Sequence, residues 1–552
     1  MIAPAPRAPA ARATVAAAAA LALAASCGSA PPPRGSSPKL VRRAPAARAP
    51  RLVVLIVVDQ LPAWSFARKR PALTAGFDRL LREGEWHTGE YPSAATITAP
   101  GHALIATGEP PATSGILSNE WYRRAQDKIL RSVEDPDAAG ASSSGAPSTS
   151  SRWLRVPGIA DAMAAAAAAK RGKAVSVSLK DRAAILVLGR AGLPIWYDRK
   201  AVAWTTIASP PPWLAEHNRR APIAAHLKDR WTADDPRRLA ELSGTTDDQP
   251  GEVGERGFGP TFPHDPVATK DPAFALFAAP VSNQLIFEAG LAAIEGEALG
   301  QDAVPDLLAL SLSAHDYVGH GWGHESWEAW DMLLRTDDQL GRFLEALDAR
   351  VGPGRWAMLV TSDHGAGPLP ERVGGGRITY ESIRDAANRA ASTALGLGDW
   401  IADVKYPSIY LSAAARARPA RDQQRAIAKI LYALRAYPGI ARAERTVDVA
   451  GRCGDRTADA RMICLALDPA ESGEVFYMPA RGWLVHERVE PVAASHGSLY
   501  EHDREVPLLL IPPGRAPHAP LTAPASPKLP MARVSSILAQ WLGVPAPQTL
   551  PR

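Results

Sequence analysis

Five short segments of the chain consist almost entirely of apolar residues. Continuous apolar runs of this length are typical of β-strands that are buried on both faces, as in the parallel sheets of α/β proteins. We therefore predict strands over residues 52–58, 174–179, 306–312, 356–361 and 506–511.

Helical patterns alternate with these strands. They cover residues 77–82, which Gly84 ends, and residues 159–169 and 327–347. This alternation predicts an α/β fold with a mostly parallel central sheet and helices on both of its faces. In such sheets, ligands bind beyond the carboxyl ends of the strands.

Two segments interrupt this alternation, and we interpret both as insertions. Residues 136–152 are rich in Ala, Ser and Gly and predict a surface insertion, whereas residues 370–490 are expected to form a cap over the site. The cap contains Cys453 and Cys464. These cysteines either form a disulfide or remain two buried thiols.

The N-terminus differs in composition from the rest of the chain. An apolar run of signal-peptide length predicts a signal peptide over residues 1–27, and a region rich in Pro, Ala, Arg and Ser predicts a flexible tether over residues 28–50. The folded domain is then 51–552. The residues around Cys27 resemble a bacterial lipoprotein cleavage box, which would place a lipid on Cys27. Ordinary cleavage nearby is the alternative.

The location of the basic residues argues against a nucleic-acid partner. The formal net charge is +5, but residues 1–51 hold eight Lys or Arg and no Asp or Glu. Subtracting these eight charges leaves −3 for the remainder. The basicity therefore belongs to the leader and not to a binding face, and we expect no DNA or RNA partner. We expect an exported bacterial monomer, either periplasmic or anchored at the outer membrane.

Candidate ligands follow the predicted strands. The first four of these strands are followed by Asp59, by Lys180, by Asp316 and His320, and by Asp363 and His364. Each residue alone has an ordinary explanation, such as a helix cap or a core histidine. Together they suit zinc, which binds carboxylates and imidazoles and keeps a position open in hydrolases.

Thr98 lies between the first two predicted strands, residues 52–58 and 174–179. Pro100 would occupy an early turn of the following helix, so that the Thr98 hydroxyl faces the positive end of the helix dipole. Such a position favours an alkoxide and a bound phosphate. The alternative is that Thr98 only caps the helix.

Taken together, these motifs resemble the alkaline phosphatase superfamily. They are Thr98-x-Pro-x-His, the strand-end Asp59, Asp316-xxx-His320, the Asp363-His364 pair and Ser-His496-Gly-Ser. Within the superfamily they are most similar to the phosphate-irrepressible alkaline phosphatases and the nucleotide pyrophosphatase/phosphodiesterase group.

The resemblance implies two Zn²⁺ ions. One is held by Asp316, His320 and His496, and the other by a second set of residues. The second set is Asp59, Asp363 and His364, completed by the oxygen of Thr98. It also implies that Thr98 is the nucleophile, that a phosphothreonine intermediate forms, and that configuration at phosphorus is retained. His102, His315 and His324 exceed these needs, and we expect them to pack or to support the ligands.

The resemblance assigns the binding of phosphoryl oxygens to Asn119, Lys180 and Arg182. Two added cations favour a phosphomonoester dianion over a diester monoanion. We therefore predict a zinc-dependent alkaline phosphatase that hydrolyses small phosphate monoesters. The alternatives are a nucleotide pyrophosphatase/phosphodiesterase and a catalytically silent lipoprotein that binds phosphate or nucleotide. A sulfatase is disfavoured because the Thr98 motif lacks the Cys or Ser, and the following Arg, that sulfatases need.

Overall fold

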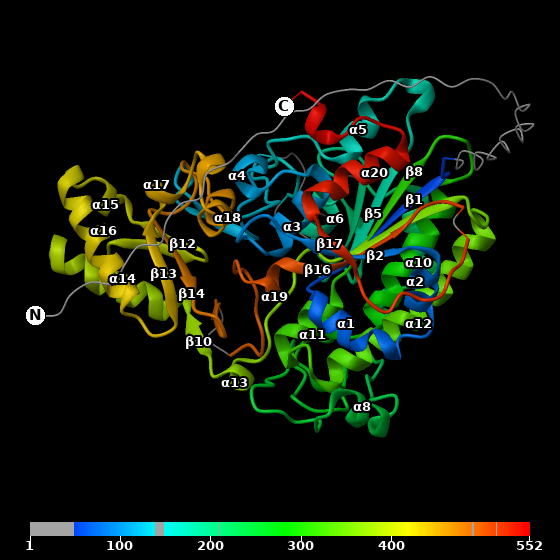
Figure 1. Cartoon of the computed structure of the whole chain (residues 1–552), viewed down its shortest axis with the longest axis horizontal. Coiled ribbons are helices and arrows are strands. Elements are labelled where there is room, and N and C mark those ends of the chain that lie inside the picture. The colour runs from blue at the N-terminus through cyan, green and yellow to red at the C-terminus, as the bar shows by residue number, and fades with distance from the viewer. Residues whose placement is uncertain (1–48, 138–147, 208, 488–490, 515, 552) are drawn as a thin grey trace, which may run out of the picture. The chain divides into compact units, whose positions relative to one another are not determined.

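A nine-stranded sheet forms the centre of the computed structural model (Figure 1). The structure describes residues 49–137, 148–207, 209–487, 491–514 and 516–551. The predicted signal peptide, Cys27, nearly all of the tether and the middle of the 136–152 insertion lie outside the described residues. The strands in sheet order are β17 (Ala525–Pro530), β2 (Glu85–Glu90), β16 (Glu505–Ile511), β9 (Trp356–Thr361), β1 (Leu52–Val58), β8 (Asp306–Leu312), β5 (Ala174–Ser178), β6 (Leu193–Asp198) and β7 (Ala203–Thr206).

The sheet is mostly parallel, as the sequence predicts. Strands β9, β1, β8, β5 and β6 run parallel to one another, while β16 and β7 are antiparallel to their neighbours. All five predicted strands are present within one residue of their predicted bounds. Strands β2 and β17 lie toward one edge and β6 and β7 toward the other, and none of these four was predicted. Both β2 and β17 are largely polar or exposed, so they carry no continuous apolar signal.

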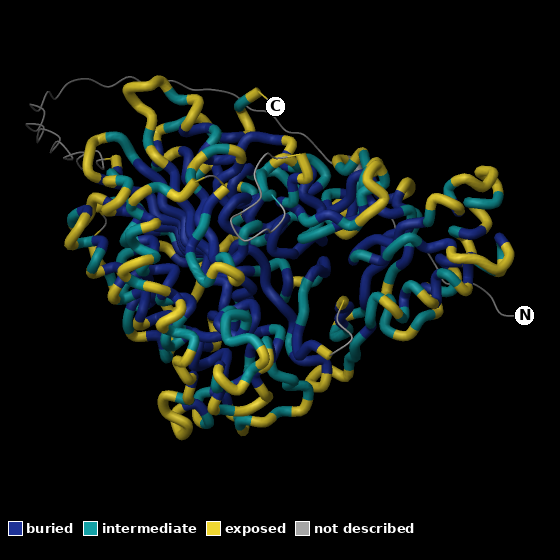
Figure 2. The backbone as a smooth tube through the Cα atoms, turned by 180° about the vertical axis from the view of Figure 1, so that it is seen from behind, coloured by how far each residue is buried: buried dark blue, intermediate teal, exposed yellow. Residues whose placement is uncertain are grey.

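Helices cover both faces of the sheet because the side chains of each central strand alternate between two apolar clusters. Leu52, Val54 and Ile56 of β1 belong to one cluster, and Val53 and Leu55 belong to the other. The first cluster includes residues of α1 (Ala63–Lys69), α2 (Gly76–Glu83), α10 (Val281–Gly296) and α12 (Trp327–Arg350). The second includes residues of α3 (Thr98–Thr107), α5 (Ile159–Ala165) and α20 (Val534–Leu542). Figure 2 shows the strands as the buried centre of this arrangement.

One predicted helix is too long. The prediction of a helix over 159–169 is wrong at its end, because α5 stops at Ala165 and a separate 3₁₀ turn covers Ala168–Lys170. Ala166 is already extended, and most residues between Ala164 and Lys170 are exposed. Good helix propensity does not extend a helix when the added turn buries no apolar surface.

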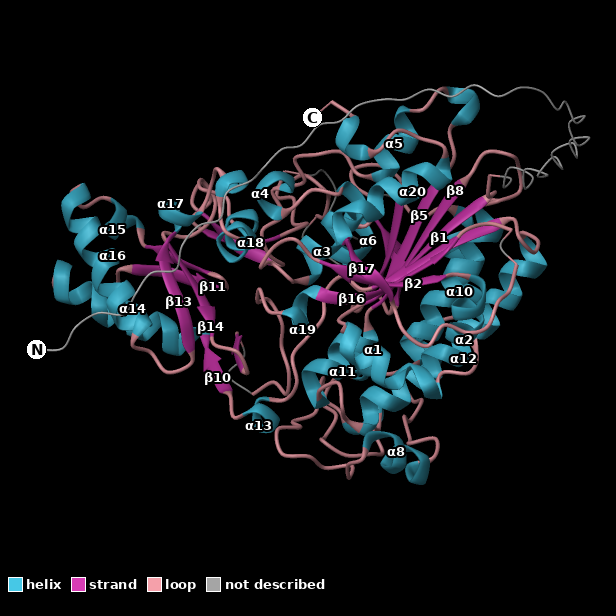
Figure 3. Cartoon of the chain, viewed as in Figure 1, coloured by secondary structure: helices cyan, strands magenta, loops and turns pink. Residues whose placement is uncertain are grey.

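The segment predicted as a cap contains a second, smaller sheet (Figure 3). Its antiparallel strands are ordered β11 (Ile401–Lys405), β12 (Ser408–Leu411), β14 (Val475–Pro479) and β13 (Ile440–Arg445). Helices α14 (Tyr380–Leu395) and α16 (Ala420–Arg435) pack on it and share its apolar core. Cys453 and Cys464 form a disulfide in this segment, which decides between the two alternatives left open by the sequence.

No single helix among the described residues has both the length and the apolar character needed to cross a membrane. One bent pair, Pro272–Ala278 with Val281–Gly296, meets the criteria of length and composition when its two parts are taken together.

Candidate active site

The register of the parallel strands brings the predicted ligands to one edge of the sheet. Val58 of β1 pairs with Leu312 of β8, and Val57 pairs with Thr361 of β9. The residues that come next along the chain therefore leave the sheet side by side. Asp59 follows β1, and Asp363 lies two residues after β9. Asp316 lies on the helix that follows β8.

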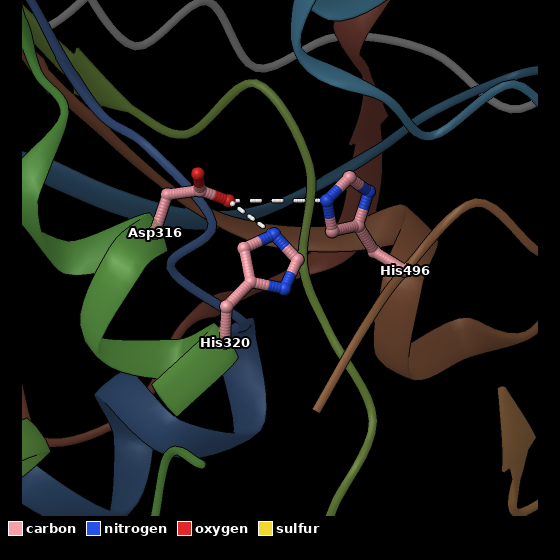
Figure 4. Close-up of side chains that lie close together, drawn as sticks. All are labelled: Asp316, His320 and His496. Atoms are coloured by element: carbon pink, nitrogen blue, oxygen red, sulfur yellow. Dashed lines mark ion pairs between the residues drawn. The ribbon is translucent and has the colours of Figure 1, made fainter. Parts of the chain in front are cut away.

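The first ligand group consists of Asp316, His320 and His496. Helix α11 (Ala314–Trp322) places Asp316 and His320 one turn apart, with Asp316 Oδ1 3.2 Å from His320 Nε2. His496 comes from the loop before β16, and its Nε2 lies 3.8 Å from the same oxygen. Figure 4 shows the three side chains turned toward one another.

The second group surrounds His364, which is fully buried. His364 Nε2 lies 3.5 Å from Asp363 Oδ2, 3.6 Å from Asp59 Oδ1 and 3.5 Å from Thr98 Oγ1. Asp316 also approaches this group, since ligand atoms of Asp59, Asp316 and His364 lie within 4.8 Å of one another. Asp316 therefore lies between the two groups.

His320, His496 and His364 make the same kind of hydrogen bond. Each donates a hydrogen bond from Nδ1 to a backbone carbonyl, which can only accept. The bonds are His320 to Ala494 at 2.9 Å, His496 to Thr96 at 2.8 Å and His364 to Gly365 at 3.0 Å. The proton on Nδ1 leaves the lone pair on Nε2, so each ring can bind a metal ion through Nε2.

The donor atoms fit zinc. Bonds of 2.0–2.2 Å from a tetrahedral ion place its ligand atoms about 3.4 Å apart, close to the separations around His364. Asp59 Oδ1 and Asp363 Oδ2 are both buried. No described residue donates a hydrogen bond to Asp59 Oδ1, and the nearest donor to Asp363 Oδ2 is His102 Nδ1 at 3.3 Å. Buried carboxylate oxygens without a donor are costly unless a cation compensates them. The residues present thus form two groups suited to divalent metal ions.

Lys180 connects the two groups. Its Nζ donates to Asp59 Oδ2 and to Asp316 Oδ2, both at 2.6 Å, and its side chain is 1% exposed. Burial favours the neutral amine, but Asp316 and Asp59 outweigh it and raise the pKa of Lys180. Burial also opposes ionisation of Asp316, yet Lys180 and the neighbouring histidines hold the pKa of Asp316 well below its usual value.

Thr98 is the first residue of α3 and is not its N-cap, because Ile97 occupies that position. The interpretation of Thr98 as a simple cap is therefore wrong. Gly101 allows the helix to approach the end of β9, since a Cβ at this position would overlap the Asp363 carbonyl. This close approach brings Thr98 Oγ1 next to His364.

Asn119 and Arg182 lie beside the nucleophile helix. Asn119 Oδ1 accepts hydrogen bonds from the Ala99 backbone N–H at 2.9 Å and from Arg182 Nε at 3.1 Å. Both residues line a cavity of about 300 Å³, together with His496 and with Tyr380 and Tyr406 from the segment predicted as a cap. The structure thus brings every predicted site residue to one place.

The sequence alone did not single out Gln60, which contacts several ligands. Its only signal was its position directly after Asp59. Of the additional histidines, His102 donates to the Thr98 carbonyl at 2.9 Å and lies 3.3 Å from Asp363, whereas His324 donates to Gln60 at 2.9 Å. His315 stacks on His324 with a ring-centroid separation of 5.2 Å. The expectation that these histidines pack or support the ligands agrees with these contacts.

Comparisons with known proteins agree with this geometry. Residues 53–499 match the type I phosphodiesterase/nucleotide pyrophosphatase family. The chain is 31% identical over 498 residues to alkaline phosphatase PhoK from Sphingomonas sp., covering 85% of this chain and 84% of PhoK.

Two solved structures have the same fold. The crystal structure of wild-type alkaline phosphatase PafA superposes with a TM-score of 0.80 at 24% identity, covering 92% of this chain and 99% of PafA. Murine ectonucleotide pyrophosphatase/phosphodiesterase 5 superposes with a TM-score of 0.50 at 14% identity, covering 91% of this chain and 96% of its own. The predicted resemblance to the alkaline phosphatase superfamily is confirmed. The chain is a phosphoesterase and belongs to the type I phosphodiesterase/nucleotide pyrophosphatase family.

Proposed function

We propose that this protein is a two-zinc alkaline phosphatase that hydrolyses phosphate monoesters through a phosphothreonine at Thr98. The observation that carries the proposal is the position of Thr98 Oγ1, 3.5 Å from His364 Nε2 and at the start of α3. A hydroxyl in this position faces both a metal-ligand group and the positive end of a helix dipole.

Each group of site residues has its own role in the proposed reaction. Bound zinc ions would supply positive charge and favour the alkoxide form of the Thr98 hydroxyl. Thr98 attacks phosphorus in line, and the leaving oxygen departs on the side of Asp316, His320 and His496. The leaving group then enters the 300 Å³ cavity, which Tyr380 and Tyr406 help to line. Water hydrolyses the phosphothreonine in a second displacement, so configuration at phosphorus is retained.

The preference for monoesters follows from charge. Lys180 and Arg182 would add two cations to the site that receives the phosphoryl group. A monoester dianion has more negative charge to interact with them than a diester monoanion has. The Arg182 guanidinium also keeps its charge at all accessible pH values, because the pKa of arginine lies above 12.

A comparison of two substrates tests this proposal. We expect p-nitrophenyl phosphate to be hydrolysed with a higher kcat/KM than bis(p-nitrophenyl) phosphate. We also expect chelation to abolish both activities and zinc to restore them. Diester preference would reject the monoesterase assignment. Full activity after exhaustive chelation, with no metal detected in the sample, would reject the role of the ions.

A diesterase is the second candidate, and one cavity favours it. A space of about 400 Å³ lies on the other side of Lys180 and Arg182, with Trp196, Tyr197 and Tyr317 in its wall. The second substituent of a diester would point in this direction. The family to which the chain belongs is also that of the type I phosphodiesterases. The substrate comparison above distinguishes the two candidates.

We also propose export with a lipid on Cys27. The apolar run and cleavage-box sequence support this proposal, and the Cys453–Cys464 disulfide is of a kind that persists in oxidising compartments. Fractionation of expressing bacteria should place the wild type in the membrane fraction and Cys27→Ser in the soluble exported fraction. Equal distribution of the two proteins would reject lipidation.

A further inference from the structure

Gln60 is a fully buried residue in an unusual backbone conformation. It follows Asp59 at the carboxyl end of β1 and has a φ of 62°, in the left-handed region that glycine favours. Residues other than glycine adopt this region at a cost, and such strain is common where surrounding contacts fix a functional geometry. The contacts of Gln60 show what is fixed here.

Gln60 contacts ligands of both metal groups. Its backbone N–H donates to Asp363 Oδ1 at 3.1 Å. Its side-chain Nε2 donates to Asp316 Oδ1 at 2.6 Å and lies 3.2 Å from His320 Nε2. One residue is therefore bonded to a carboxylate of each group, and the left-handed turn lets its backbone and side chain point to different groups.

His324 fixes the orientation of the Gln60 amide. Its Nε2 donates to Gln60 Oε1 at 2.9 Å, so the amide nitrogen must face Asp316. The ring of His324 is held by stacking on His315 and by edge contact with Trp64. Gly319 leaves room for the amide, since a Cβ at this position would overlap Gln60 Oε1.

Asp316 is consequently held at both of its oxygens. Lys180 donates to Oδ2 and Gln60 donates to Oδ1, each at 2.6 Å. A carboxylate with two fixed donors cannot rotate freely, and fixed outer contacts of this kind commonly set the affinity of a metal site. The Gln60 bond depends on His324, which links the ligand to the core beneath it.

We propose that Gln60 is a positioning residue that holds the ligands of both metal groups in register, with His324 setting the orientation of its amide. This inference rests on the proposed two-metal function. Its main consequence is a higher zinc affinity of the group formed by Asp316, His320 and His496.

Zinc titration of metal-stripped protein against a chromophoric chelator tests the proposal. We expect Gln60→Leu to weaken one of two zinc-binding events by about 10- to 100-fold. Gln60→Asn tolerates the left-handed backbone but is one methylene shorter, so it should show a similar loss. Gln339→Leu is the matched control, because Gln339 is another buried glutamine and its amide donates to the Pro280 carbonyl. It should leave both affinities unchanged.

His324→Phe provides a second route that leaves Gln60 itself in place. This substitution should weaken the same zinc-binding event. Adding Gln60→Leu should cause little further loss of affinity, because both changes disrupt the same chain of hydrogen bonds from His324 through Gln60 to Asp316. Thermal unfolding of the metal-stripped variants identifies any that do not fold, and the remaining variants decide the question.

Unchanged or tighter zinc binding by folded Gln60 variants would overturn the inference, since tighter binding would mean that the amide competes with the ion. Additive losses in the double variant would overturn the role of His324. Failure of the wild type to bind two zinc ions would instead reject the proposed function.

Discussion

Arg182 Nε donates a hydrogen bond to Asn119 Oδ1 at 3.1 Å, and the Ala99 backbone N–H donates to the same oxygen at 2.9 Å. Because both donors use the oxygen, the amide nitrogen is left to donate its protons elsewhere. This orientation agrees with the predicted role of Asn119 as a donor to a phosphoryl oxygen.

The first prediction therefore concerns Asn119→Asp. The new carboxylate keeps the bonds to Ala99 and Arg182 but replaces a donor with a negative charge facing the substrate. We expect kcat/KM for p-nitrophenyl phosphate to fall by about 100-fold or more. Asn388→Asp is the control, because Asn388 lies on α14 and its Oδ1 likewise accepts a backbone N–H, from Trp400. Equal losses in the two variants would contradict a phosphate-binding role.

The second prediction compares the two ends of α3. Thr98→Ala removes the proposed nucleophile, and we expect kcat to fall by at least about 1,000-fold. Acid quenching with labelled substrate should trap a phosphoprotein in the wild type and none in the variant. Thr107→Ala removes a buried hydroxyl at the other end of the same helix, where it bonds to the backbone of Ala103 and Glu109. This variant should retain labelling. A labelled Thr98→Ala protein would show that another residue is the nucleophile.

The third prediction concerns the stability of the metal-free protein. Lys180→Met leaves the buried carboxylates of Asp59 and Asp316 without their common cation. Removing one partner from a buried ion pair costs about 3–5 kcal/mol. We expect a loss of this size in the free energy of unfolding of stripped protein, measured with denaturant, and a smaller loss with zinc bound. Equal losses in the two states would mean that bound ions do not replace the charge of Lys180.

The fourth prediction uses Lys69, a buried lysine that donates to the Ala329 carbonyl at 2.9 Å. Burial, assisted by Arg68, lowers the pKa of Lys69 from 10.5 to about 7. Between these values the unfolded chain binds more protons than the folded one, so the contribution of Lys69 to stability becomes more favourable as pH rises. The slope is at most about 1.4 kcal/mol per pH unit.

Lys69→Met should remove this contribution. We expect the variant to be more stable than the wild type near pH 7. The difference between their free energies of unfolding should shrink toward pH 10. Denaturant titrations of both proteins at several pH values measure the difference. A difference that does not change with pH would show that Lys69 keeps its usual pKa in the folded protein.

Local sequence pattern was enough to predict much of the scaffold. The central strands were predicted because residues such as Leu52 to Val58 are buried on both faces and must all be apolar. The spacing of Asp316 and His320 also carries its own geometry, since four residues separate neighbours on one face of a helix. Strands β2 and β17 could not be predicted in this way, because partial burial places little constraint on their side chains.

The sequence by itself thus determined the buried strands, the order in which ligands follow them, and the chemical types of those ligands. Only the tertiary structure decided which atoms meet. His496 is oriented by a carbonyl 400 residues away, and Gln60 reaches Asp316 across 256 residues. Periodicity records the burial of each residue against its near neighbours, whereas such contacts depend on how distant segments pack. Lys180 shows the difference: its charge was visible in the sequence, but its position between Asp59 and Asp316 was set by three neighbouring strands.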